Sequence, residues 1–114
     1  IGHAIESFYL NKEDKILHGE AISIGMICES FISYKKTNFS LETAKKIKTH
    51  LNSIYPKIHF NKNDLKEILS LMKYDKKNYL NNIRFSLLKE VGKVEIDVEI
   101  DENLILDSFD FYSN

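Results

Sequence analysis

The fold is decided by one long stretch with an apolar periodicity, ILHGEAISIGMICESFISY, which spans residues 16–34. Within it, apolar side chains recur at spacings of four and three residues, a period typical of one face of an α-helix. The stretch therefore predicts the longest and most buried helix of the chain. Gly25, on the neighbouring face, lowers helix propensity by about 1 kcal/mol, so we expect another segment to pass close to it. The buried stripe is predicted to comprise Leu17, Ala21, Ile24, Cys28 and Phe31.

Apolar residues at helical spacing elsewhere in the chain predict shorter helices around this one. Residues 1–10 carry such a pattern and are expected to form the end of a helix. Three further helices are predicted from side chains that commonly cap a helix N-terminus. These caps are Ser40, then Asn63 or Asp64, and finally Asp101.

A small β element is predicted between the last two helices. Apolar and polar residues alternate over 83–87 and again over 94–100, as in strands with one buried face. Gly92 marks a turn between them, so the two strands are expected to pair as a hairpin. Residues 112–114 are expected to form a frayed tail. The sequence thus predicts a mainly α fold with one small β-hairpin, in a single domain over residues 1–114.

Composition excludes several classes of partner. Sixteen basic and seventeen acidic residues leave a net charge of −1, so no overall field attracts nucleic acid or an anionic membrane. No apolar run approaches the ~20 residues of a membrane span, and the first residues lack the order of a signal peptide. Cys28 is the only cysteine, which excludes an internal disulfide and fits a reducing cytoplasm. We therefore expect a cytoplasmic protein.

Two histidines are the residues on which chemistry could depend. His3 and His18 lie on successive predicted helices, with Glu6 and Glu20 beside them in the sequence. They could face each other as metal ligands, or as a ligand and a base. A catalytic zinc usually has three protein ligands, and the alternative is that both histidines are structural or merely exposed. The residues alone leave both hypotheses open.

A polar loop before the first strand is a second candidate site. Lys76 and Lys77 follow Asp75 there, and one ammonium could bind a phosphate as a point charge. The alternative is a solvated charge cluster of no function. His50 and His59 have no comparable setting and are predicted to be surface residues.

Four short motifs follow one another along the chain: Gly2-His3-Ala4-Ile5-Glu6, Leu17-His18-Gly19-Glu20-Ala21 leading into Ile24-Gly25-Met26, Asp75-Lys76-Lys77-Asn78, and Ile83-Arg84-Phe85 to Val91-Gly92. Their order closely resembles the C-terminal domain of 3-dehydroquinate synthase over nearly the whole chain. Other sugar phosphate cyclases, such as 2-deoxy-scyllo-inosose synthase, and metal-dependent glycerol dehydrogenases share parts of the pattern. The Asp-Lys-Lys loop favours the dehydroquinate branch.

The resemblance implies a fold and an activity. Enzymes of that family join an N-terminal Rossmann-like domain for NAD to a helical C-terminal domain that bears most of a zinc site, and the active site lies between the two. They convert a seven-carbon keto sugar-acid phosphate (DAHP) to 3-dehydroquinate with release of phosphate, in the shikimate pathway of aromatic amino acid biosynthesis. NAD transiently oxidises a hydroxyl, which acidifies the adjacent carbon–hydrogen bond before elimination, reduction and ring closure.

The resemblance also implies roles for individual residues. His18 matches one of three zinc ligands. The second histidine ligand of the family lies four residues before the position of His3, hence before Ile1, and the third, a glutamate, lies farther upstream. His3 instead resembles a non-ligand histidine near the substrate phosphate that helps to move protons. Lys76 or Lys77 resembles the basic residue that binds the phosphate.

The remaining motif positions carry no metal role of their own. Glu6 and Glu20 are interpreted as groups that orient a neighbour, cap a helix or form an ion pair. The hypothesis that His3 and His18 both bind metal is replaced by the assignment of His18 alone.

The chain is expected to be a piece of a longer enzyme, because Ile1 already lies inside a helical pattern without a cap. Without the NAD-binding domain and two zinc ligands, the isolated chain is expected to be inactive and to bind zinc poorly. The full-length protein is expected to be a homodimer, as is common in the family. Two alternatives remain: a related cyclase or metal-dependent polyol dehydrogenase with another substrate, and a non-catalytic helical interaction module.

Overall fold

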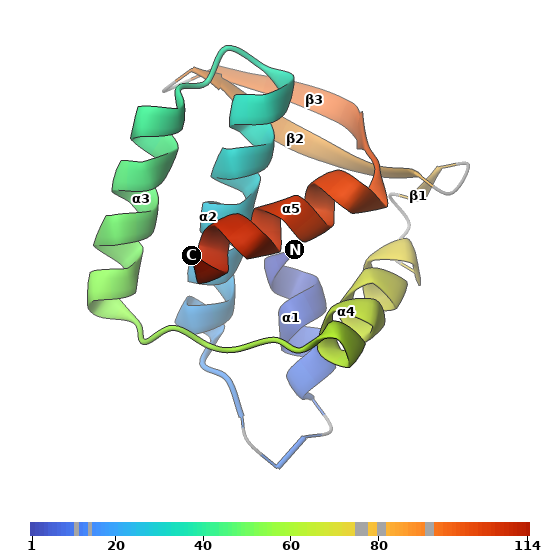
Figure 1. The fold of residues 1–114 in the computed structure, drawn as a ribbon. Coiled ribbons are helices and arrows are strands. Elements are labelled where there is room, and N and C mark those ends of the chain that lie inside the picture. Colours follow the sequence, from blue (N-terminus) through green and yellow to red (C-terminus); the bar gives the residue numbers. More distant parts are fainter. Residues whose placement is uncertain (11, 14, 75–77, 80–81, 91–92) are drawn as a thin grey trace.

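The protein is mainly helical, with a small antiparallel sheet (Figure 1). The structure, a computed structural model, describes residues 1–10, 12–13, 15–74, 78–79, 82–90 and 93–114, and it describes residues between 74 and 99 by their backbone alone. The elements in chain order are α1 (Gly2–Tyr9), α2 (His18–Lys36), α3 (Leu41–Ile54), α4 (Lys62–Tyr74), β1 (Asn78–Tyr79), β2 (Asn82–Glu90), β3 (Lys93–Ile100) and α5 (Glu102–Ser113). The predicted fold class is confirmed.

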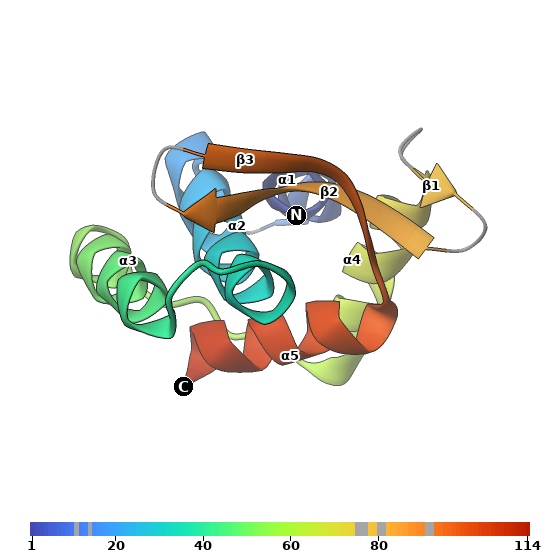
Figure 2. The ribbon, with the colours of Figure 1, turned by 90° about the horizontal axis from the view of Figure 1, so that it is seen from above.

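Helix α2 is the central element. It contacts α1, α3, α5 and β2. Figure 2, seen from above, shows the strands β2 and β3 on one side of α2 and the helix α5 on the opposite side. Helix α2 is therefore covered on several sides, as expected of the longest and most buried helix.

The core forms around the apolar face of α2. Ile27, Cys28 and Ile32 have no exposed surface, and buried side chains from α1, α4 and α5 pack with them in one cluster. The predicted stripe is wrong at its first residue, because Leu17 is 68% exposed. Leu17 precedes the helix with an extended backbone (φ −74°, ψ 146°), so its side chain does not follow the helical period. Phe31, at the other end, is only partly buried.

The helix starts follow from capping side chains. Ser40 and Asp101 cap α3 and α5 as predicted, and each side chain accepts a hydrogen bond from the backbone N–H three residues later, at 3.0 and 2.8 Å. The predicted cap of α4 is wrong. Asn61, not Asn63 or Asp64, lies before the first helical residue, and the Asp64 N–H donates to Asn61 Oδ1 while the Asn61 N–H donates to Asp64 Oδ2. Such a reciprocal pair is a capping box.

The predicted hairpin is present as β2 and β3, which pair antiparallel with Ile83 opposite Ile100. The short strand β1 also pairs with β2, so the described strands form a sheet in the order β1-β2-β3. Ile100 is fully buried, which agrees with the predicted buried face of the second strand. Gly92 lies outside the described residues.

The end of the chain is ordered as a helix rather than frayed. α5 continues to Ser113, and Tyr112 is only 1% exposed. The Tyr112 hydroxyl accepts a hydrogen bond from the Ile58 N–H at 2.9 Å, and the Lys57 ammonium donates to the Ser113 carbonyl at 2.9 Å. Both contacts tie the end of α5 to the connection between α3 and α4, which explains why the predicted tail is wrong.

Candidate functional site

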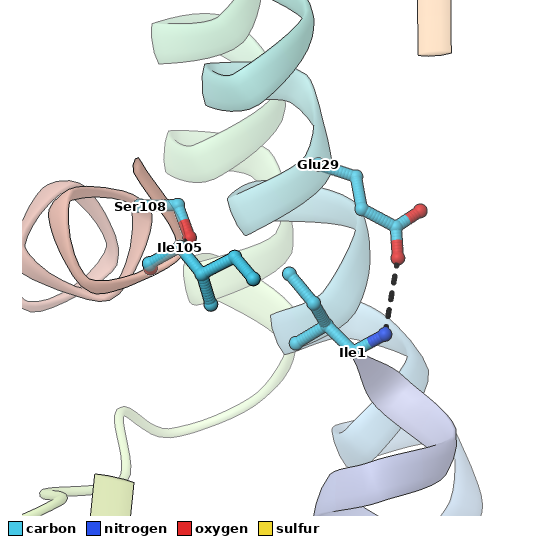
Figure 3. Close-up of polar contacts among 4 residues, drawn as sticks. All are labelled: Ile1, Glu29, Ile105 and Ser108. Carbon is cyan, nitrogen blue, oxygen red and sulfur yellow. Dashed lines mark hydrogen bonds and ion pairs between the residues drawn. The ribbon is translucent and has the colours of Figure 1, made fainter. Parts of the chain in front are cut away.

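The two motif-bearing helices, α1 and α2, pack against each other at glycines. A Cβ atom added to Gly25 of α2 would lie 2.8 Å from the backbone nitrogen of Gly2, and one added to Gly2 would lie 3.0 Å from the Ala21 carbonyl oxygen. The segment expected to pass close to Gly25 is therefore the start of α1. The Ile1 amino nitrogen also lies 3.4 Å from Glu29 Oε2 of α2 (Figure 3).

This packing brings together Glu6 of α1 and His18, the first residue of α2. The His18 Nδ1 and Glu6 Oε2 atoms are 2.9 Å apart. An ionised carboxylate only accepts hydrogen bonds, so Nδ1 carries the proton and donates it. In the neutral ring the lone pair is then on Nε2. The His18 side chain is 74% exposed, so this nitrogen is available to a ligand.

The backbone at His18 is fixed by its neighbours in the motif. The Leu17 N–H donates to Glu20 Oε1 at 3.0 Å, and the Ala21 N–H donates to the Leu17 carbonyl. Glu20 is therefore a helix-capping residue, one of the roles the sequence had left open. Gly19 packs under the Tyr55 phenol, since a Cβ atom there would lie 2.5 Å from the hydroxyl oxygen.

Of the other predicted site residues, the structure describes His3 but not the two lysines. His3 lies in the first turn of α1, three residues before Glu6, and its side chain is exposed. Helical spacing places His3 and Glu6 on neighbouring positions of one face. Lys76 and Lys77 lie outside the described residues, between α4 and β1, and their role in phosphate binding stays a prediction. His50 and His59 are exposed, as predicted.

Zinc and NAD fit this chain to different degrees. A histidine held by a carboxylate through one ring nitrogen is the usual arrangement of a zinc-binding imidazole, so His18 suits one ligand position. Within the described residues there is no group of three or more side chains that could hold a metal ion. The sequence contains no glycine-rich strand-to-helix turn of the kind that binds a dinucleotide. The residues present therefore do not fit NAD.

The sequence did not reveal which group Glu6 contacts. Its spacing places it on the same helical face as His3, whereas the structure shows a contact with His18 across the connection between α1 and α2. One signal in the sequence does point to the contact between Glu6 and His18. Metal-binding histidines commonly have an acidic partner, and Glu6 is a carboxylate close to His18 in the chain.

Fold and site together define a mainly helical domain in which a carboxylate orients an exposed histidine at the start of the central helix. Comparison with known proteins identifies its family. The family model of the 3-dehydroquinate synthase C-terminal domain matches residues 1–78. The chain therefore belongs to the 3-dehydroquinate synthase family and corresponds to its C-terminal domain.

Relatives from several bacteria support this assignment. The chain is 38% identical over 112 residues to the 3-dehydroquinate synthase of Parabacteroides distasonis, covering 98% of this chain and 32% of that protein. It is 36% identical to the enzyme of Endomicrobium trichonymphae, over 91% of this chain and 28% of the relative. It is 35% identical to the enzyme of Dictyoglomus thermophilum, over 92% of this chain and 29% of the relative. The chain thus spans about a third of the length of these relatives.

Proposed function

We propose that this chain is the C-terminal part of a 3-dehydroquinate synthase, which converts DAHP to 3-dehydroquinate with release of phosphate. The observation that carries the proposal is the His18–Glu6 pair, at the family's own motif positions and within the residues that the family model matches. The matched relatives cited above are all named 3-dehydroquinate synthase. Their names support this branch over other sugar phosphate cyclases, polyol dehydrogenases or a non-catalytic module.

His18 is proposed to be one of three zinc ligands, through Nε2. When bound, zinc acts as a Lewis acid that polarises the substrate hydroxyl to be oxidised. The two other ligands are proposed to come from residues that precede Ile1 in the complete protein.

The substrate phosphate is proposed to bind between the motif that contains His3 and the motif that contains Lys76 and Lys77. His3, which is exposed in the first turn of α1, is proposed to lie on the substrate side, where its imidazole helps to move protons. Lys76 or Lys77 is proposed to neutralise the phosphate as a point charge. His3 is therefore assigned to proton transfer and the lysine to binding.

The remaining parts of the enzyme are proposed to lie outside this chain. An N-terminal Rossmann-like domain would supply the NAD site, and the complete enzyme is proposed to be a cytoplasmic homodimer. None of the helices in the described residues combines the length and apolar character needed to cross a bilayer.

The zinc assignment is tested in the complete protein by the His18→Ala substitution. We expect the variant to lose bound zinc, measured by elemental analysis after dialysis, and to lose turnover of DAHP in the presence of NAD. His50→Ala is the matched control, since His50 is an exposed histidine of α3, and it should retain both properties. Unchanged zinc content in His18→Ala would refute the ligand assignment. A product other than 3-dehydroquinate would show that the enzyme belongs to another branch.

A further inference from the structure

We propose that Glu6 is a positioning residue for zinc binding, which fixes both the tautomer and the direction of the His18 ring. The proposal rests on the proposed function of His18 as a metal ligand and extends it to a second residue. Glu6 does not bind the metal or the substrate itself. It acts through the contact of its Oε2 atom with His18 Nδ1, at 2.9 Å.

The exposure of His18 makes such a partner necessary. With 74% of its side chain in solvent, the imidazole has little packing to select one rotamer, and a free neutral imidazole exchanges its proton between the two nitrogens. A charge-assisted hydrogen bond to one nitrogen selects both the ring orientation and the protonated atom. In the described structure Glu6 provides this bond.

Glu6 is held more firmly than the ring that it orients. Its side chain is 33% exposed, and on α1 it follows Ile5, which is fully buried, and precedes Phe8, which is 7% exposed. The start of α1 is also fixed against α2 by the close approach of Gly2 to Gly25. The carboxylate is therefore mounted on a helix whose position is set by the core and by the same α2 that carries His18.

A simple surface ion pair makes different predictions from a positioning residue. An exposed ion pair contributes little to stability, and if Glu6 were only such a pair, its removal would leave the Zn²⁺ affinity unchanged. Removal of a positioning carboxylate weakens metal affinity, typically by about 10- to 100-fold. It also changes the proton distribution of the metal-free ring, and this property is measurable without any catalytic assay.

The test uses the complete protein and three variants, Glu6→Ala, Glu6→Gln and Glu42→Ala. Zn²⁺ affinity is measured by competition with a chromophoric chelator. We expect Glu6→Ala to bind Zn²⁺ about 10- to 100-fold more weakly than the unmodified protein and Glu6→Gln, which keeps an acceptor oxygen without the charge, to lie between them. Glu42→Ala removes an equal charge from the exposed start of α3, where Glu42 pairs with Lys46, and should leave the affinity unchanged.

A second measurement follows the imidazole directly. Nitrogen-15 NMR of the metal-free protein at about pH 8, above the ordinary titration range of an imidazole, should show His18 protonated on Nδ1. In Glu6→Ala the proton should shift substantially to Nε2. Because the unmodified protein is itself informative, poor folding of Glu6→Ala would not prevent the test, and Glu6→Gln provides the affinity comparison.

The outcomes separate this proposal from the proposed function. If Glu6→Ala binds Zn²⁺ as tightly as the unmodified protein, or if His18 of the unmodified protein is protonated on Nε2, the positioning role is refuted while the zinc role of His18 stands. If neither the unmodified protein nor His18→Ala binds Zn²⁺, the proposed function fails and the positioning role fails with it. Weaker binding in Glu6→Ala together with the tautomer shift supports both.

Discussion

Cys28 shows how burial can dominate the chemistry of one residue. The thiol is fully buried in α2 beneath α5, and Sγ lies 3.6 Å from the Ser108 carbonyl oxygen, to which the S–H donates. Burial disfavours the charged thiolate and raises the pKa of Cys28 to about 12, from 9.0. Cys28 is therefore a small packing residue, as the sequence predicted, and not a nucleophile or a metal ligand.

We predict that Cys28 of the native chain is inert to a chromogenic aromatic disulfide at pH 8. Only the thiolate attacks such a reagent, and a pKa about three units above the ordinary value reduces the thiolate fraction about 10³-fold. The rate is measured by absorbance, first in buffer and then in denaturant, where reaction should be fast. Because the chain has one cysteine, the signal needs no deconvolution. Rapid reaction in buffer would show that the thiol is accessible.

The burial of a residue can be predicted from the sequence where the helical period applies, and not where that period ends. Cys28 lies in mid-helix and is buried as its spacing indicates. Leu17 is one residue before the helix, so its extended backbone removes it from the stripe. The order of Tyr112 does not show in the local sequence, because its partner, the Ile58 N–H, is 54 residues away. A contact between residues so far apart in the sequence leaves no signal in the pattern of neighbouring residues.

At the scale of elements, the decisive feature is the close crossing of α1 and α2. Gly25 allows the start of α1 to approach the α2 backbone, and this approach places Glu6 beside His18. The sequence predicted both helices and a close neighbour at Gly25. It could not identify that neighbour as α1, since the crossing depends on packing in three dimensions and not on the period of either helix.

We predict that Gly25→Ala destabilises the chain, by about 1–3 kcal/mol of unfolding free energy. Alanine favours a helix over glycine by about 1 kcal/mol, but the new Cβ atom would lie 2.8 Å and 3.1 Å from the Gly2 backbone nitrogen and Cα. Backbone atoms cannot rotate away as a side chain can, so α1 must shift. Urea unfolding followed by circular dichroism measures the change.

Gly19→Ala is the control for this prediction. Its Cβ atom would also meet a close neighbour, but that neighbour is the end of the Tyr55 side chain, which can turn aside. The gain in helix propensity then offsets the rearrangement, and we expect a change within about 1 kcal/mol. A Gly25→Ala variant as stable as the unmodified chain would show that α1 and α2 are not locked at the glycines.

At the scale of the whole molecule, the outer face of α2 continues beyond His18 as an apolar stripe. Ile22 and Met26 follow His18 at intervals of four residues, so the three share one face. Ile22 is 40% exposed and Met26 is 50% exposed. A zinc ligand in an active site between two domains must face the second domain. The proposed N-terminal domain is therefore expected to cover Ile22 and Met26 as well.

The two methionines of the chain provide a direct test of this arrangement. Met26 is half exposed, whereas Met72 is 5% exposed in the core. In the chain of residues 1–114, we predict that hydrogen peroxide converts Met26 to the sulfoxide much faster than Met72, because oxidation follows exposure. In the complete protein, oxidation of Met26 should slow towards the rate of Met72, measured site by site by peptide mass spectrometry. Met72 should react slowly in both and serves as the internal control. Equal rates for Met26 in the chain and in the complete protein would place the second domain elsewhere on the surface, and the face of α2 that carries His18 would then not line the proposed cleft.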